Sequence, residues 1–314
     1  MTASQRPTPA APPTFCSDAC RAAGEPLFAT ATRADVWLLL EYTGRWGAKA
    51  LEENALPQPV RRRLSALEAE QPHTRIQFIK RTPPYPPGPV QFFVALAHLP
   101  RPALYRFELS HYADLLDLDI EAILSGDPHF EPHRVHDPLY LVCTNSLRDA
   151  CCAKYGLEVY NELAKRVGGS AWQTTHLGGH RFAPILLVLP QALHYGRVKP
   201  GNLDTLVRAT ERGEVLLPRY RGRTIYDRPV QAAEHFLREA TGRIAIDAFA
   251  LLGSEQTAEG EWSVRLAETA GDAVHRVRVA AETFPEPILK SCSAAAPEPV
   301  EHFRLIAHEV EGGA

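Results

Sequence analysis

The 314-residue sequence carries almost no excess charge and lacks a long apolar run. A formal net charge of −3 gives no electrostatic reason to expect nucleic acid or a membrane surface as a partner. Apolar stretches such as 185–189 are far too short to span a bilayer, and the first fifteen residues contain no apolar core of a signal peptide. We therefore expect a soluble, cytoplasmic protein.

Cysteine is also scarce. The six cysteines are spread unevenly, two of them are adjacent, and no secretory signal precedes them, so a framework of disulfides is not indicated. A Cys-x-x-Cys motif is absent, which argues against a thiol–disulfide enzyme of thioredoxin type. What the chain does have is length and 45% hydrophobic residues, enough for two or three modest cores.

Two cysteines and two histidines stand out in the middle of the chain. Cys143 and Cys152 have eight residues between them, whereas structural zinc sites normally space their cysteines two to four residues apart. His176 and His180 flank a Leu-Gly-Gly sequence, and paired glycines favour a tight turn over a helix. Thiolates and imidazoles suit zinc, copper or an iron–sulfur cluster better than calcium or magnesium. The four residues therefore predict a soft-metal site.

The local sequence favours Cys152 over its neighbour as a ligand. Ser146 and Asp149 form a Ser-x-x-Asp start signal, so a helix should begin with Ser146 as its N-cap. Cys152 then lies in the first two turns, where the helix N-terminus and Arg148 favour its thiolate form. Cys151 points about 100° away around the helix. We expect Cys151 to be a packed thiol or to support the site without binding the metal.

The same residues follow the pattern of a known family. The sequence resembles the sucrase/ferredoxin-like family, also described as thioredoxin-like ferredoxins, whose pattern is a cysteine, an Arg-Asp pair, a cysteine nine positions after the first, and later a His-x-Gly-Gly-His turn. The chain matches this pattern in order and spacing. The likeness covers most of the chain and continues through Trp37 to Glu41, Gly44 to Gly47, Arg181 to Ala183, Leu187 to Pro190, His194 to Arg197, Tyr220 to Arg223 and Gln231 to Glu234.

This resemblance implies a [2Fe–2S] cluster that carries one electron, with Cys143, Cys152, His176 and His180 as its ligands. Where members commonly have His, Gly and a basic residue, this chain has Asn, Ser and Leu at 145–147. None of these is expected to bind the cluster, so the departure should affect partner docking and potential. A glycosidase would need two carboxylates across a sugar site, and the sequence indicates no such pair.

We expect a one-electron transfer protein rather than an enzyme with a substrate of its own. Replacing two thiolates by neutral imidazoles should raise the potential above that of four-cysteine plant-type ferredoxins. Imidazoles that lose a second proton should make the potential fall as pH rises. The expected partner is a redox protein, either a reductase or an electron acceptor. The alternatives are a structural zinc protein with the same four ligands, a thiol-redox protein of thioredoxin type, and a pure interaction scaffold.

The apolar pattern predicts an α/β (α+β) protein built from two related units. Residues 26–130 are expected to form a thioredoxin-like scaffold domain without ligands, and 131–240 the thioredoxin-like [2Fe–2S] ferredoxin domain. A disordered leader is expected over 1–25 and a small C-terminal α+β extension over 241–314. The elements behind this division are expected strands at 36–42, 75–80, 90–96, 103–109, 138–143, 171–175, 185–189 and 193–198, helices at 59–70, 112–124, 202–211 and 230–240, a helix from Ser146 to the glycines at 168–169, and a hairpin pairing 262–266 with 277–281.

The remaining cysteines and one arginine-rich loop lie outside the predicted site. Cys16 and Cys20 have a spacing that would permit a second metal site, but no other ligands are predicted nearby, so we interpret them as packing thiols. Cys292 lies among prolines and is not expected to be a ligand. The loop could dock an acidic partner, although a solvated loop is the simpler interpretation of Arg219, Arg221 and Arg223.

Overall fold

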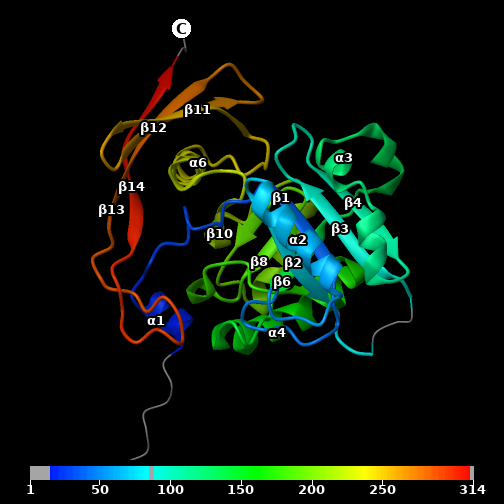
Figure 1. Ribbon diagram of the computed structural model, residues 1–314. Helices are drawn as coiled ribbons and strands as arrows, with labels where there is room; N and C mark the ends of the chain where they lie inside the picture. The colour runs from blue at the N-terminus through cyan, green and yellow to red at the C-terminus, as the bar shows by residue number, and fades with distance from the viewer. Residues whose placement is uncertain (1–14, 85–87, 312–314) are drawn as a thin grey trace, which may run out of the picture.

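The structure is a computed structural model that describes residues 15–84 and 88–311. Its centre is a mixed sheet of ten strands, in the order β10-β9-β8-β6-β7-β2-β1-β3-β4-β5 (Figure 1). A second sheet of four antiparallel strands, β11 to β14, follows at the C-terminal end of the chain. The predicted mixed α and β content is confirmed.

Two halves of the large sheet have the same arrangement of elements. The first half contains β1 (Val36–Glu41), α2 (Gln58–Glu70), β2 (Thr74–Lys80), β3 (Val90–Leu96), β4 (Ala103–Leu109) and α3 (Ile120–Leu124). The second half contains β6 (Leu139–Cys143), α4 (Ala150–Val167), β7 (Ala171–Thr174), β8 (Leu186–Leu189), β9 (Leu193–Tyr195) and α5 (Leu203–Glu211). In each half the first two strands are parallel and the other pairings are antiparallel. This is the βαβ–ββα order expected for two thioredoxin-like units.

The two halves share one sheet, because β2 and β7 pair antiparallel with Ile79 opposite Thr174. Short strands extend both outer edges, β5 (Arg134–Val135) beside β4 and β10 (Tyr220–Arg223) beside β9. The sheet therefore runs without interruption across the expected boundary at residue 130.

Apolar side chains on both faces explain why the central strands are buried. In β1, Leu38 and Leu40 pack beneath α2, whose Val60 and Leu64 lie one turn apart on its inner face. The opposite face of the sheet carries one cluster that spans both halves and includes Trp37, Leu39, Leu141, Trp172 and Leu187. Strands buried on both faces read as continuous apolar runs, as these do.

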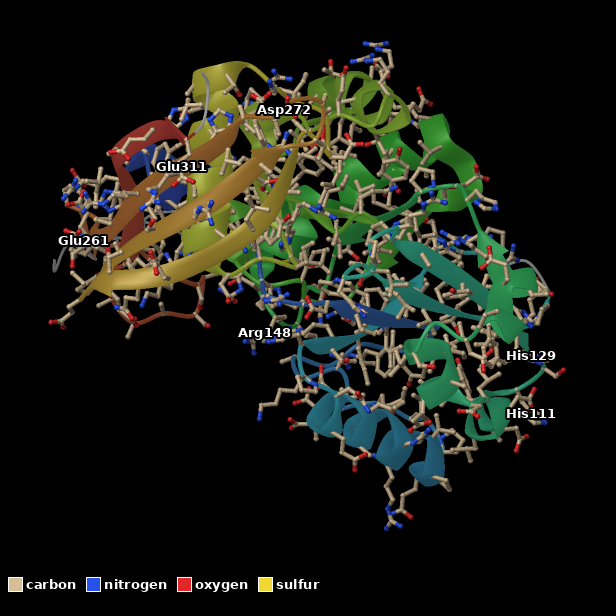
Figure 2. All side chains as sticks on the ribbon, turned by 90° about the horizontal axis from the view of Figure 1, so that it is seen from above. His111, His129, Arg148, Glu261, Asp272 and Glu311 are labelled. Atoms are coloured by element: carbon tan, nitrogen blue, oxygen red, sulfur yellow. The ribbon has the colours of Figure 1, made fainter. Side chains whose placement is uncertain are left out.

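The C-terminal sheet packs against α6 (Arg228–Thr241). This helix begins before residue 241, where the C-terminal extension was expected to start. Its strands are β11 (Phe249–Ala258), β12 (Glu261–Glu268), β13 (Val274–Thr283) and β14 (Glu301–Glu311). The predicted hairpin is confirmed, because β12 and β13 pair with Val264 opposite Val277. Figure 2 labels Glu261 and Glu311 on this sheet, Asp272 in the turn between β12 and β13, His111 and His129 on the opposite side of the view, and Arg148 between them.

Two expectations need correction. The leader expected over 1–25 contains a helix, α1 (Cys16–Ala22), whose two cysteines are buried; residues 1–14 of that leader lie outside the described residues. The helix expected over 112–124 is split into a 3-10 helix at Tyr112–Asp117 and α3. The split occurs because the Asp119 carboxylate accepts a hydrogen bond from the Ala122 N–H (3.0 Å) and starts a new helix.

No helix in residues 15–84 or 88–311 has both the length and the apolar character needed to cross a membrane.

Candidate metal centre

The first two candidate ligands lie at the end of a strand and the start of the next helix. Cys143 is the last residue of β6, and Cys152 is in the first turn of α4. The N-cap is Asp149 rather than the expected Ser146, because the Asp149 carboxylate accepts a hydrogen bond from the Cys151 N–H at 2.9 Å. Ser146 instead lies in a turn where the Asn145 carbonyl accepts the N–H groups of residues 148 and 149.

A glycine allows this helix to approach the strand end closely. A Cβ on Gly156 would lie 2.1 Å from the carbonyl oxygen of Cys143, far inside any contact distance. The absence of a side chain at this position lets the first turns of α4 pack directly on the end of β6. The contact between helix and strand brings Cys152 close to Cys143 at the end of β6.

The two candidate histidines lie on a tight turn after β7, as the paired glycines predicted. Gly178 and Gly179 both have positive φ, at 93° and 74°, and a 3-10 helix starts at His180. Their surroundings also exclude a side chain: a Cβ on Gly178 would lie 2.2 Å from the Thr32 hydroxyl oxygen, and one on Gly179 would lie 2.5 Å from an Arg221 nitrogen. Backbone conformation and space therefore both require glycine here.

Arg221 anchors this turn from beneath. Its guanidinium donates to the Gly178 carbonyl at 3.0 Å, to the Thr30 hydroxyl at 3.0 Å and to His194 Nε2 at 3.1 Å. The side chain is 1% exposed, and burial lowers the pKa of Arg221 to about 9. The expectation of a solvated or partner-docking loop is wrong for this residue, because its charge faces the interior and holds the backbone between the two histidines.

Three of the four candidate ligands converge. His176 Nδ1 lies 3.9 Å from the sulfur of Cys143 and 3.9 Å from that of Cys152, and the three donor atoms all lie within 4.8 Å of one another. Both cysteines are buried, whereas His176 is partly exposed. The site therefore has a closed sulfur side and a nitrogen side that reaches the surface.

His180 lies beside this group without completing it. Its ring centroid is 4.9 Å from that of His176, and its Nε2 lies 3.6 Å from an oxygen of Asp149. Its Nδ1 is buried and makes no hydrogen bond to any residue that the structure describes. A buried nitrogen without a partner next to a thiol–imidazole group fits the role of a fourth ligand, so the donor set suits a soft metal or an iron–sulfur cluster.

The two thiols of the candidate site shift each other's pKa. Hydrogen bonding from the Cys152 thiol and then from His176 holds the pKa of Cys143 well below its usual range. The same Cys143 hydrogen bond, together with burial, raises the pKa of Cys152 well above its usual range. Both directions arise because each sulfur is the other's hydrogen-bond partner. The expectation that the helix N-terminus and Arg148 favour the Cys152 thiolate stays a prediction, because a bound metal would hold both sulfurs deprotonated.

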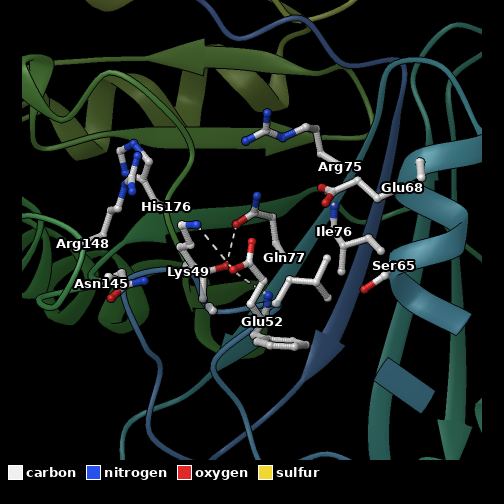
Figure 3. A pocket seen from close by; sticks show the side chains of 16 residues that line it. Lys49, Glu52, Ser65, Glu68, Arg75, Ile76, Gln77, Asn145, Arg148 and His176 are labelled. Carbon is white, nitrogen blue, oxygen red and sulfur yellow. Dashed lines mark hydrogen bonds and ion pairs between the residues drawn. The ribbon is translucent and has the colours of Figure 1, made fainter. Parts of the chain in front are cut away.

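A cavity of about 570 Å³ opens beside His176, between the two halves of the sheet (Figure 3). The second half contributes Asn145, Arg148 and His176, and the first half contributes several charged side chains, Lys49, Glu52, Glu68 and Arg75. Lys49 and Glu52 form an ion pair of 3.5 Å in its wall. The first half thus shapes the approach to the candidate centre, and no local sequence signal indicated this.

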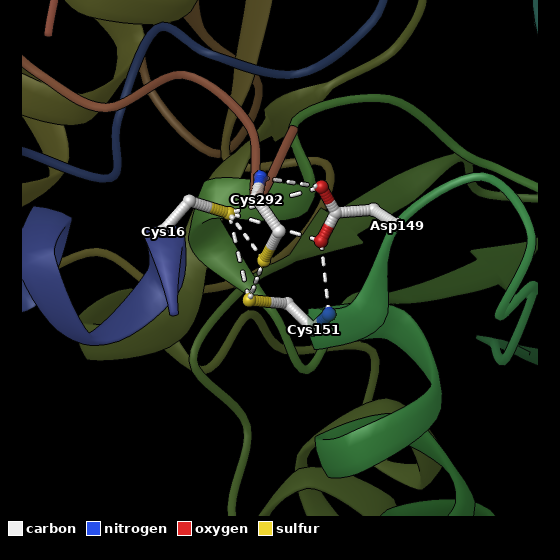
Figure 4. A group of neighbouring side chains, drawn as sticks. All are labelled: Cys16, Asp149, Cys151 and Cys292. Carbon is white, nitrogen blue, oxygen red and sulfur yellow. Dashed lines mark hydrogen bonds between the residues drawn. The ribbon is translucent and has the colours of Figure 1, made fainter. Parts of the chain in front are cut away.

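Three of the remaining cysteines form a second group. Cys16, Cys151 and Cys292 gather around the Asp149 carboxylate (Figure 4). The expectation that no other potential ligands lie near Cys16 is therefore wrong. Cys20, by contrast, donates a hydrogen bond to Glu25 at 2.9 Å and lies outside the group, as a packing thiol would.

Comparison with known proteins gives one match. No curated protein and no solved structure matches the chain significantly. A family model described as sucrase/ferredoxin-like matches residues 27–222, which is well over half of the chain and includes both candidate cysteines and both candidate histidines. The chain therefore belongs to the sucrase/ferredoxin-like family.

Proposed function

We propose that this protein carries single electrons on a [2Fe–2S] cluster held by Cys143, Cys152, His176 and His180. The observation that carries the proposal is the convergence of two buried thiols with His176, beside a His180 Nδ1 that is buried and unpaired among the described residues. Membership of a ferredoxin-like family supports the same assignment.

When bound, such a cluster supplies one reversible electron. The chain's own residues would hold it with water excluded on the side of Cys143 and Cys152, whereas His176 and His180 are partly exposed. We therefore expect electrons to enter and leave on the histidine side. Neutral imidazoles in place of two thiolates should raise the potential relative to four-cysteine ferredoxins, and the expected fall of the potential with rising pH stays a prediction.

The partner would be a reductase or an electron acceptor protein, met in the cytoplasm. We expect it to dock near the loop before α4, because this loop lies next to the candidate centre and is exposed. Leu147, an apolar residue that is 46% exposed, and Arg148 both lie on it. These residues offer an apolar contact and a positive charge to a partner.

A structural zinc site is the second candidate function. Tetrahedral zinc with sulfur and nitrogen ligands separates those atoms by about 3.6 Å. The two sulfur–nitrogen separations here are 3.9 Å, close to that value, so the same residues also suit a single ion. A zinc protein would be colourless, and a chelator would destabilise it.

Purification without oxygen separates the two candidates. We expect a reddish-brown protein with about two irons and two acid-labile sulfides per chain. Cys143→Ser and Cys152→Ser should bleach it, whereas Cys20→Ser, which removes a buried thiol elsewhere, should not. Cys151→Ser tests the choice within the adjacent pair: bleaching by this change and not by Cys152→Ser would reverse our assignment. A colourless wild-type protein from iron-replete cells, with zinc or no metal, would refute the cluster.

A further inference from the structure

A second group of ligand atoms lies at the N-terminus of α4 (Figure 4). Cys16 comes from α1, Cys151 from the first turn of α4, and Cys292 from the segment between β13 and β14. Their sulfurs are 3.5 Å (16 to 151), 3.2 Å (151 to 292) and 3.6 Å (292 to 16) apart. An Asp149 oxygen lies 3.8 Å from the Cys16 sulfur. Segments remote in sequence thus bring three thiols and a carboxylate to one point.

These separations fit one metal ion. A tetrahedral zinc site with Zn–S bonds of about 2.3 Å spaces its sulfurs by roughly 3.8 Å and a sulfur and an oxygen by roughly 3.6 Å. A disulfide needs sulfurs about 2.05 Å apart, and pairing any two of these cysteines would leave the third alone. Three thiolates and one carboxylate together supply four donors, which is the number that a structural zinc site uses.

The charge and burial of the group also call for a cation. Cys16 and Cys151 are completely buried, and Asp149 is 4% exposed. The Asp149 carboxylate accepts backbone N–H groups from Cys151 and Cys292, each at 2.9 Å, but within the described chain no lysine or arginine pairs with it. A buried carboxylate is costly unless an opposite charge compensates it. Cys292 is only partly buried, which leaves a route by which an ion can enter.

We propose that Cys16, Cys151, Cys292 and Asp149 bind one zinc ion in a closed structural site. This site is separate from the proposed cluster site and does not depend on it. The ion would fasten α1 and the segment before β14 to the start of α4. Because Cys151 precedes Cys152 and Asp149 lies 3.6 Å from His180, the same ion would also fix the backbone that presents two of the proposed cluster ligands.

Zinc and iron content of the purified full-length chain tests the proposal. Cys16→Ser and Cys292→Ser should each lose one zinc per chain, whereas Cys20→Ser, on the same helix as Cys16, should keep it. Cys143→Ser should lose its iron and keep this zinc, so the two proposals can fail independently. Equal zinc in Cys16→Ser and Cys20→Ser would overturn the assignment, as would wild-type protein from zinc-replete cells that contains none.

A measurement on the wild-type protein covers the case in which these variants do not fold. X-ray absorption at the zinc edge should show three sulfur neighbours at about 2.3 Å and one oxygen at about 2.0–2.2 Å. Substitution with Co²⁺ should give thiolate-to-cobalt charge transfer in the near ultraviolet and the intense visible bands of a tetrahedral site. Zinc with only nitrogen and oxygen neighbours, or an intact-mass loss of two hydrogens showing a disulfide within the group, would contradict the site.

Discussion

Replacing Gly156 by Ala tests how the fold brings the two candidate cysteines together. The added Cβ would lie 2.1 Å from the Cys143 carbonyl oxygen, and a carbon–oxygen contact needs about 3.3 Å. Strand and helix must therefore separate by about 1.2 Å. The obstacle is the backbone carbonyl of a buried residue, so no side-chain rotation can relieve the clash.

The expected magnitude combines two opposing effects. Overpacking of a tight interior costs about 1–3 kcal/mol. Alanine in a helix interior regains about 1 kcal/mol over glycine. We therefore expect Gly156→Ala to lower the free energy of unfolding by about 0–2 kcal/mol. The effect on the centre should be larger, because metal–ligand distances must hold within about 0.2 Å and Cys152 moves with the helix.

Gly169→Ala is the matched control. Gly169 follows the same helix and does not have a positive φ, and a Cβ added there would meet nothing within 4 Å. This change should leave the free energy of unfolding unchanged or raise it by about 0.4–1 kcal/mol, because alanine reduces the conformational entropy of the unfolded chain. The two variants are compared by urea unfolding, monitored by tryptophan fluorescence, and by their content of iron and sulfide per chain. If Gly156→Ala unfolds at the same urea concentration as Gly169→Ala and keeps its full metal content, the close approach of α4 to β6 does not set the cysteine positions.

Four further predictions concern the second half. Arg221→Gln leaves the buried acceptors at Gly178 and His194 unpaired. Each unpaired acceptor should lower the free energy of unfolding in urea by about 1–3 kcal/mol, and an unchanged unfolding midpoint would contradict the anchoring role. Burial, and to a smaller extent the charge of Arg221, hold the pKa of His194 well below its usual range. The neutral side chain therefore contributes its full stabilisation above about pH 6.5, the ordinary pKa of histidine. Below that pH the free energy of unfolding should fall by up to about 1.4 kcal/mol per pH unit. His194→Gln should remove that part of the slope. His180→Cys should keep the cluster but lower its midpoint potential, and the wild-type potential should fall between about pH 6 and 10.

Local patterns were sufficient for most of the elements. The expected strands at 90–96 and 103–109 have the bounds found for β3 and β4, because apolar runs between turn residues are read within a few positions. The His-Leu-Gly-Gly-His turn was equally readable, since its conformation depends on the glycines themselves.

Long-range contacts account for what the sequence did not reveal. Cys16 contacts Cys151, which is 135 positions away in the sequence, and Cys292, which is 276 positions away. No sequence motif covers such separations. Asp149 rather than Ser146 caps α4, and its second oxygen is held by the N–H of Cys292, far along the chain. Arg221 looked solvated because its buried partners, Thr30 and Gly178, come from other segments. Local propensity indicates which residues could cap a helix or bind a ligand, and contacts with distant segments determine which of them does so.

The pairing of β2 with β7 limits how this protein can be shortened. β7 is a four-residue strand that ends two residues before His176, and its outer side is covered by the first half through Ile79 and Lys80. A fragment of residues 131–240 would leave this strand as an open edge, with unpaired main chain next to the metal ligands. Such a fragment should aggregate or lose its centre. The smallest unit expected to work therefore retains the half that supplies no ligand at all.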